Sequence, residues 1–144
     1  FSDIYDLLKW MLEQEAIEVV KNFDFLIDYE DAIHFVMEYI EENAYILNCA
    51  YDSMGRDELK RFFYNDFISL ARKIIDDTEE QCGLAVTNEF KAFLCDFITE
   101  AIAGMLVTGF KNKEKLQQGS AISNIKVILS SLSDILRRAP QKEI

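Results

Sequence analysis

The chain has little proline, glycine or histidine, and each shortage argues against a class of protein. One proline and five glycines in 144 residues are too few for a sandwich of many short strands, and a hydrophobic content of 50% argues against disorder. The one histidine, His34, stands three residues after Asp31, but a helical di-metal site needs a second such motif. No GxGxxG, P-loop, HExxH or GxSxG pattern occurs. We therefore expect no enzyme, no metal site and no cofactor.

Basic charge and long apolar runs are also scarce. The formal net charge is -11, which repels a phosphate backbone, so these residues by themselves are not expected to bind nucleic acid. The longest apolar stretches, such as 101–107, are far shorter than the roughly 20 residues that a bilayer-spanning helix needs. We expect no membrane-spanning helix.

The cysteines and the first residues bear on the cellular compartment of the protein and on whether the chain is a piece of a longer one. Cys49, Cys82 and Cys95 form neither a CxxC pair nor a disulfide framework, a pattern typical of a reducing cytoplasm. The chain starts at Phe1, its earliest methionine is Met11, and no signal-peptide pattern is present. These features predict a piece of a longer cytoplasmic protein.

Apolar residues recur at steps of three and four along almost the whole chain, the period of an amphipathic helix. The fold class is therefore all-α. We expect a single domain, 1–144, of about six helices, at 3–21, from residue 28 onward, and at 44–52, 56–81, 87–111 and 120–138.

The last two expected helices are apolar around more than one side. Such helices lie either at the centre of a fold or at an interface. In so small a chain this pattern favours a homodimer, with two helices from each subunit forming a four-helix bundle, over a buried central hairpin. The candidate dimer residues are Leu94, Ile98, Ala101, Met105, Ile122, Ile125, Leu129 and Leu132.

Three segments resemble the C-terminal regulatory region of the TetR family. Residues 1–8, FSDIYDLL, are similar to the family's junction between recognition helix and connecting helix. Residues 34–45, HFVMEYIEENAY, resemble the place where one helix ends in Asn and runs into the next. Residues 97–110, FITEAIAGMLVTGF, resemble the penultimate helix. Among subgroups, the chain looks closest to those grouped with dihydroxyacetone kinase activators.

The resemblance implies a bacterial regulator with a DNA-binding head that lies outside this sequence. It also implies dimerisation through the last two helices and a cavity for a small-molecule effector in each subunit. DNA binding then belongs to the parent protein, where the effector alters the spacing of the two heads.

Polar or aromatic side chains on inward-facing helical positions are the candidate effector ligands. They are Trp10, His34, Met37, Tyr45, Asn48, Phe63, Phe67 and Phe97. A solid aromatic core accounts for the phenylalanines equally well. The alternative function is a coactivator or adaptor that binds a protein partner on the same helical scaffold.

Overall fold

The computed structural model describes residues 6, 7, 10, 11, 13, 14, 38, 41–111 and 118–143. The described residues of the two N-terminal helices expected from the sequence are helical, and the rest of those two helices lies outside the described part. Within that part the fold is all-helical, as predicted, apart from one isolated β-bridge.

Two glycines determine where the first labelled helices begin and end. Helix α3 spans Ala44–Met54 and α4 spans Arg56–Cys82, and Gly55 separates them with a φ of 85°. Gly83 has a φ of 66°, the left-handed conformation that glycine adopts without steric cost, and its amide donates to the carbonyls of Glu79 and Glu80. The predicted limits, 44–52 and 56–81, therefore agree with the structure to within two residues.

The remaining helices differ from the sequence prediction at one point. Helix α5 spans Asn88–Lys111, close to the predicted 87–111. The single final helix predicted at 120–138 is wrong, because the segment forms α6, Gln118–Ser130, and α7, Leu132–Arg138, with Ser131 between them. The expectation of one continuous last helix is therefore corrected, and the count of six helices is not confirmed.

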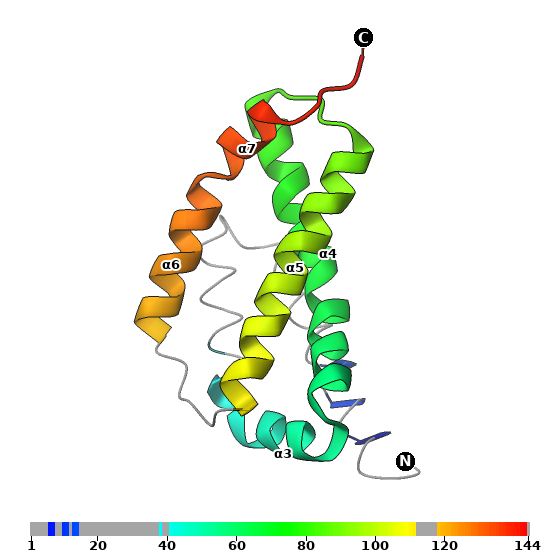
Figure 1. The fold of residues 1–144 in the computed structure, drawn as a ribbon, viewed down its shortest axis with the longest axis vertical. Coiled ribbons are helices and arrows are strands. Elements are labelled where there is room, and N and C mark those ends of the chain that lie inside the picture. The colour runs from blue at the N-terminus through cyan, green and yellow to red at the C-terminus, as the bar shows by residue number, and fades with distance from the viewer. Residues whose placement is uncertain are drawn as a thin grey trace.

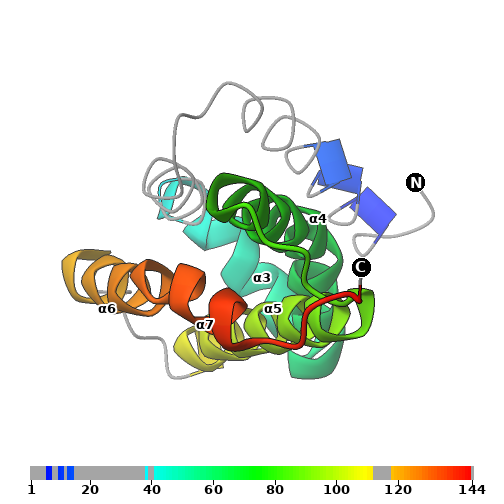
Figure 2. The same ribbon diagram turned by 90° about the horizontal axis from the view of Figure 1, so that it is seen from above.

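Helices α4 and α5 pack along each other and form the centre of the described fold (Figure 1). Helix α3 lies across one end of this pair and α7 packs against the other end. Seen from above, α6 and α7 follow each other along one side of the pair (Figure 2), and the main contacts that α6 makes among the labelled helices are with α7.

Each end of the α4–α5 pair has its own apolar core. The cluster at the α3 end joins the buried residues Leu47, Ala50, Leu59, Phe63, Phe67, Ala103, Leu106 and Val107. The cluster at the α7 end joins Ile75, Val86, Leu94, Cys95, Leu132, Leu136 and Ala139. Burial of these apolar side chains is the main force that holds α3 and α7 against the central pair.

The residues after α7 form a short strap over the turn between α4 and α5. Val86 and Gln141 form an antiparallel β-bridge. The Thr87 amide donates to the Pro140 carbonyl at 2.9 Å, and the Lys142 amide donates to the Ala85 carbonyl at 2.6 Å. These bonds tie α7 to the same turn that its apolar side chains cover.

Candidate functional site

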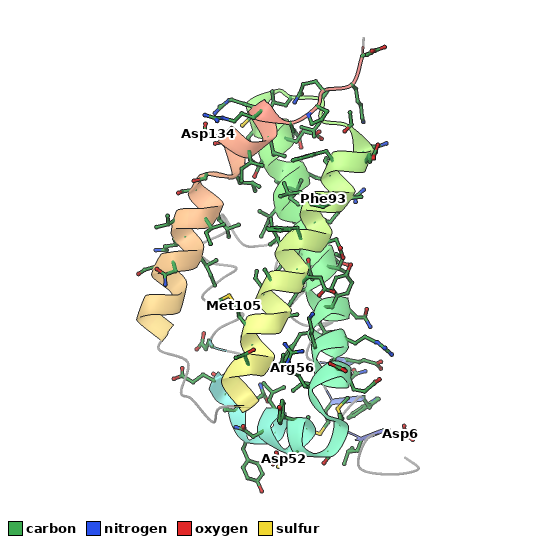
Figure 3. The ribbon with its side chains drawn as sticks, in the orientation of Figure 1. Asp6, Asp52, Arg56, Phe93, Met105 and Asp134 are labelled. Atoms are coloured by element: carbon green, nitrogen blue, oxygen red, sulfur yellow. The ribbon has the colours of Figure 1, made fainter. Side chains whose placement is uncertain are left out.

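Helix α5 carries large apolar side chains on its solvent-facing side. Phe93, Phe97 and Met105 expose 63%, 62% and 65% of their surface, and Ala101 is exposed between them. The spacing of four residues places all four on one side of the helix, and this apolar stripe of α5 covers about half of its length; Figure 3 labels Phe93 and Met105, the two ends of the stripe. The rings of Phe93 and Phe97 stack, with centroids 6.0 Å apart. Exposed apolar stripes of this kind are candidates for contact surfaces.

Helix α6 also exposes apolar side chains. Val127 and Ile128, the apolar pair of α6, expose 67% and 62% of their surface, whereas Leu129 beside them is buried. The apolar residues of this helix are therefore only partly buried.

A polar edge borders the stripe where α5 meets α4. The Tyr64 hydroxyl donates to Asp96 Oδ1 at 2.6 Å, and Lys60 Nζ lies 2.6 Å from Glu100 Oε2. The hydrogen bond to Asp96, followed by burial, raises the pKa of Tyr64 to about 12, so this hydroxyl stays protonated at neutral pH. An apolar strip with a polar rim is the usual composition of a protein interface.

A shallow recess of about 250 Å³ lies in this polar edge. Its lining residues are Arg56, Asp57, Lys60, Arg61, Tyr64 and Glu100. The basic groups pair with carboxylates, for example Arg56 with Asp57 at 3.7 Å and Arg61 with Glu58 at 3.5 Å. Because the charges are compensated, the recess does not resemble an anion site.

Two features at the α3 end of the fold match the effector residues expected from the sequence. Phe63 and Phe67 are buried and stacked, with centroids 5.8 Å apart. On α3, Asn48 Nδ2 donates to the Ala44 carbonyl at 2.8 Å, while Asn48 Oδ1 is buried with no hydrogen-bond partner. A buried acceptor without a donor costs about 1–3 kcal/mol, so a ligand donor at this atom would recover that energy.

Asp66 is a titratable residue that the sequence analysis missed. It lies half-buried on α4, and its helical neighbours Phe62 and Leu70 are apolar. Burial, with a smaller contribution from the charge of Glu13, raises the pKa of Asp66 to about 7. A single acidic residue within a run of apolar ones, at 62–70, is the only sign of it in the sequence.

Lys91 forms the best-buried ionic contact in the described part of the chain. Its Nζ lies 3.1 Å from both Asp76 Oδ1 and Glu79 Oε1, and Glu79 Oε2 accepts the Val86 amide at 2.8 Å. Burial acts to raise the pKa of Glu79, but the bonds from Lys91 and Val86 outweigh it, and the pKa is lowered. The bond to Glu79 likewise raises the pKa of Lys91. Since every charge here has a partner, the network is a structural link between α4 and α5.

The candidate effector residues do not all come together. Phe63 and Phe67 are in contact, but Tyr45 is 82% exposed on α3 and Phe97 belongs to the stripe of α5. Trp10 is about half exposed. His34 and Met37 lie outside the described residues.

The candidate dimer residues differ in how far they are exposed. Ala101 and Met105 are exposed, Ile98 and Ile125 are half-buried, and the side chain of Ile122 lies outside the description. The three leucines, Leu94, Leu129 and Leu132, are buried within the subunit. Periodicity did not single out the exposed apolar residues Phe93, Val127 and Ile128, because it does not distinguish a side that faces the core from one that faces a partner.

The described residues offer neither a metal site nor a membrane-spanning helix. No group of three or more His, Cys, Asp or Glu side chains that could hold a metal ion occurs within the described ranges. No helix among them is both long enough and apolar enough to cross a bilayer. Of the three free cysteines, Cys95 is buried, and burial raises the pKa of its thiol.

Comparison with known protein families gives a match over most of the chain. The model of a TetR-type family described as the transcriptional regulator C-terminal region matches residues 28–131. No curated protein and no solved structure matches. Because the matched segment covers well over half of the chain, the chain belongs to this family, the C-terminal region of TetR-type transcriptional regulators.

Proposed function

We propose that this regulatory domain acts as a homodimer whose contact surface is formed by the stripe of α5 and the pair of α6. The observation that carries the proposal is the exposure of Phe93, Phe97 and Met105, three large apolar side chains on one side of one helix. A two-fold axis brings identical surfaces together, so a second copy presents the matching stripe. The four-helix arrangement expected from the sequence would then combine α5 and the α6–α7 segment of each subunit.

We further propose that each subunit binds a small effector near the α3 end of α4. The support is the stacked pair of buried rings, Phe63 and Phe67, and the buried oxygen of Asn48, which has no hydrogen-bond donor; the rings would supply apolar contact and the oxygen an acceptor. An effector suited to these groups is largely apolar and carries at least one N–H or O–H group. Trp10, His34, Met37, Tyr45 and Phe97 stay candidates from the sequence alone.

The effector would act on the parent protein through the N-terminal helix. The described helical residues from Asp6 to Gln14 lie beside α4, the helix that carries the two phenylalanines (Figures 1 and 2). A ligand that packs against α4 and has different affinities for two positions of the N-terminal helix shifts the balance between them. In the parent protein this shift would alter the spacing of the two DNA-binding heads.

Native mass spectrometry of the purified chain tests both parts of the proposal, because one spectrum reports subunit number and bound small molecules. We expect a dimer with one adduct per subunit. Asn48→Leu should lose the adduct and keep the dimer, whereas Asn65→Leu, the same change at an exposed position of α4, should keep both. A monomer would refute the dimer, and an adduct retained by Asn48→Leu would refute the role of Asn48.

A protein partner in place of the small effector is the second candidate. Tyr45, 82% exposed on α3, is an aromatic side chain outside the stripe of α5 and favours a further contact surface. A dimer without any adduct, both in the wild type and in Asn48→Leu, would favour a protein partner over a small effector.

A further inference from the structure

The strap after α7 and the turn between α4 and α5 exchange hydrogen bonds in both directions. In the turn, the Ala85 amide donates to Gln141 Oε1 at 3.1 Å, and the Thr87 amide donates to the Pro140 carbonyl at 2.9 Å. In the strap, the Lys142 amide donates to the Ala85 carbonyl at 2.6 Å. Each backbone N–H and C=O group needs a partner, and here two segments far apart in the sequence supply partners to each other.

Gln141 is the one side chain of the strap in these bonds, and it uses both ends of its amide. Its Oε1 accepts the bond from Ala85, 56 residues away in the sequence. Its Nε2 donates to the carbonyls of Leu136 and Ala139, both at 2.9 Å. The last carbonyls of a helix have no amide partner within the helix, so Gln141 completes the end of α7 and holds the turn with the same group.

Apolar packing lies beside these bonds. Val86 in the turn and Ala139 at the start of the strap are both buried in the cluster at the α7 end. Val86 also forms the β-bridge with Gln141. Opening of the strap would therefore break hydrogen bonds and uncover apolar surface together.

We propose that Gln141 is a latch, whose side-chain amide keeps the strap closed over the turn between α4 and α5. The backbone bonds of the Thr87 and Lys142 amides then depend on this side chain, although neither bond includes it. The strap lies outside residues 28–131, the part of the chain that the family model matches. The latch is independent of the proposed dimer and effector.

Gln141→Met tests the latch, because methionine is similar in length to glutamine but lacks the amide that donates and accepts these bonds. Gln81→Met, the same change at an exposed position near the end of α4, is the matched control. Gln141 is itself exposed, and substitutions at exposed positions usually have small effects. A large local effect at this position is therefore specific to the latch.

The first readout is amide hydrogen exchange followed by NMR. The informative amides are those of Thr87 and Lys142, because the substitution leaves their backbone acceptors in place. In Gln141→Met both should exchange at least about tenfold faster than in the wild type, and in Gln81→Met the change should stay below about threefold. Unchanged rates at Thr87 and Lys142 would show that the backbone bonds hold the strap without the side chain, and would overturn the latch.

The second readout is limited digestion with trypsin, followed by mass spectrometry. Cleavage after Arg138, at the end of α7, needs the strap to leave the turn, and its rate follows the population of the open form when closing is fast. Gln141→Met should lose residues 139–144 at least about tenfold faster than the wild type and Gln81→Met. Equal rates would overturn the latch. Loss of helical circular dichroism in Gln141→Met would also overturn it, because the side chain would then hold the whole fold and not the strap.

Discussion

The two helices of the C-terminal segment, α6 and α7, differ in how far their apolar side chains are buried. In α7, Leu132 and Leu136 are buried against the central pair, and in α6, Val127 and Ile128 are largely exposed. Composition does not explain the difference, since both helices are rich in leucine, isoleucine or valine. The contrast teaches that α7 completes the apolar core at its end of the fold, whereas two apolar side chains of α6 stay exposed to solvent.

The sharpest test of this contrast truncates one side chain in each half. Leu136→Ala, in the buried half, should lower the free energy of unfolding by about 3 kcal/mol, because the cavity it leaves cannot collapse completely. Val127→Ala, in the exposed half, should change it by less than about 0.5 kcal/mol when measured at concentrations where the chain is monomeric. Urea unfolding gives both values. Equal losses of unfolding free energy in the two variants would show that α6 and α7 do not differ in how much their apolar side chains stabilise the fold.

The ionic contacts of Lys91 provide a second test, at the end of the α4–α5 pair where α7 packs. Lys91→Met leaves the half-buried carboxylate of Glu79 without its cation, and we expect a loss of about 2 kcal/mol at pH 7, moderated because both carboxylates keep some contact with water. Arg72→Met removes an exposed ion pair from the other oxygen of Asp76, 3.8 Å away, and should cost less than about 0.5 kcal/mol.

The pH dependence of this loss has a definite sign. Because the folded-state pKa of Glu79 is lowered, its stabilising contribution is present above the unfolded-state pKa and disappears as pH falls through the lowered value. The difference between wild type and Lys91→Met should therefore shrink in acid. A difference that grows as pH falls below about 4 would contradict this assignment.

Asp66 gives the smallest expected effect and the opposite sign. Its pKa rises to about 7 in the folded chain, so the folded state binds the proton more tightly, and stability falls as pH rises from about 4 to about 7. Asp66→Asn should remove this slope and raise the melting temperature at pH 8 by about 2 to 4 °C, the shift for about 1 kcal/mol. Melting curves at pH 4.5 and pH 8 test it. If Asp66→Asn is less stable than the wild type at pH 8, the carboxylate of Asp66 is stabilised by its surroundings, and this prediction is wrong.

The helix limits from residue 44 to 111 followed from the sequence because local signals determine them. Gly55 and Gly83 adopt positive φ angles that end one helix and separate it from the next. The spacing of apolar residues identifies the helical segments between these ends. The family resemblance stated from three short segments is confirmed by the match over residues 28–131.

The break at Ser131 did not follow from the same reasoning. Apolar periodicity continues from α6 into α7, so a method based on spacing predicts one helix. The break depends on two neighbouring hydroxyls that bond one carbonyl, an event that the Ser130–Ser131 pair permits but does not require.

The candidate site was predictable only in its residue types. The sequence identified aromatic and amide side chains such as Phe63, Phe67 and Asn48, and it identified α5 as unusually apolar. It did not indicate that Phe97 is exposed or that the oxygen of Asn48 lacks a donor, because both depend on which neighbours cover them. Asp66 was missed for the same reason.

Sedimentation equilibrium of the wild type and of Phe97→Glu tests the central claim, that the exposed stripe of α5 holds two copies together. The account predicts a wild-type dimer and at least an about hundredfold larger dissociation constant for Phe97→Glu, equivalent to about 2.7 kcal/mol, since the charge replaces an exposed ring in the middle of the stripe. Tyr45→Glu, at an exposed aromatic residue on α3, should leave the dimer unchanged. A wild-type monomer, or a Phe97→Glu dimer as tight as the wild type, would contradict the account.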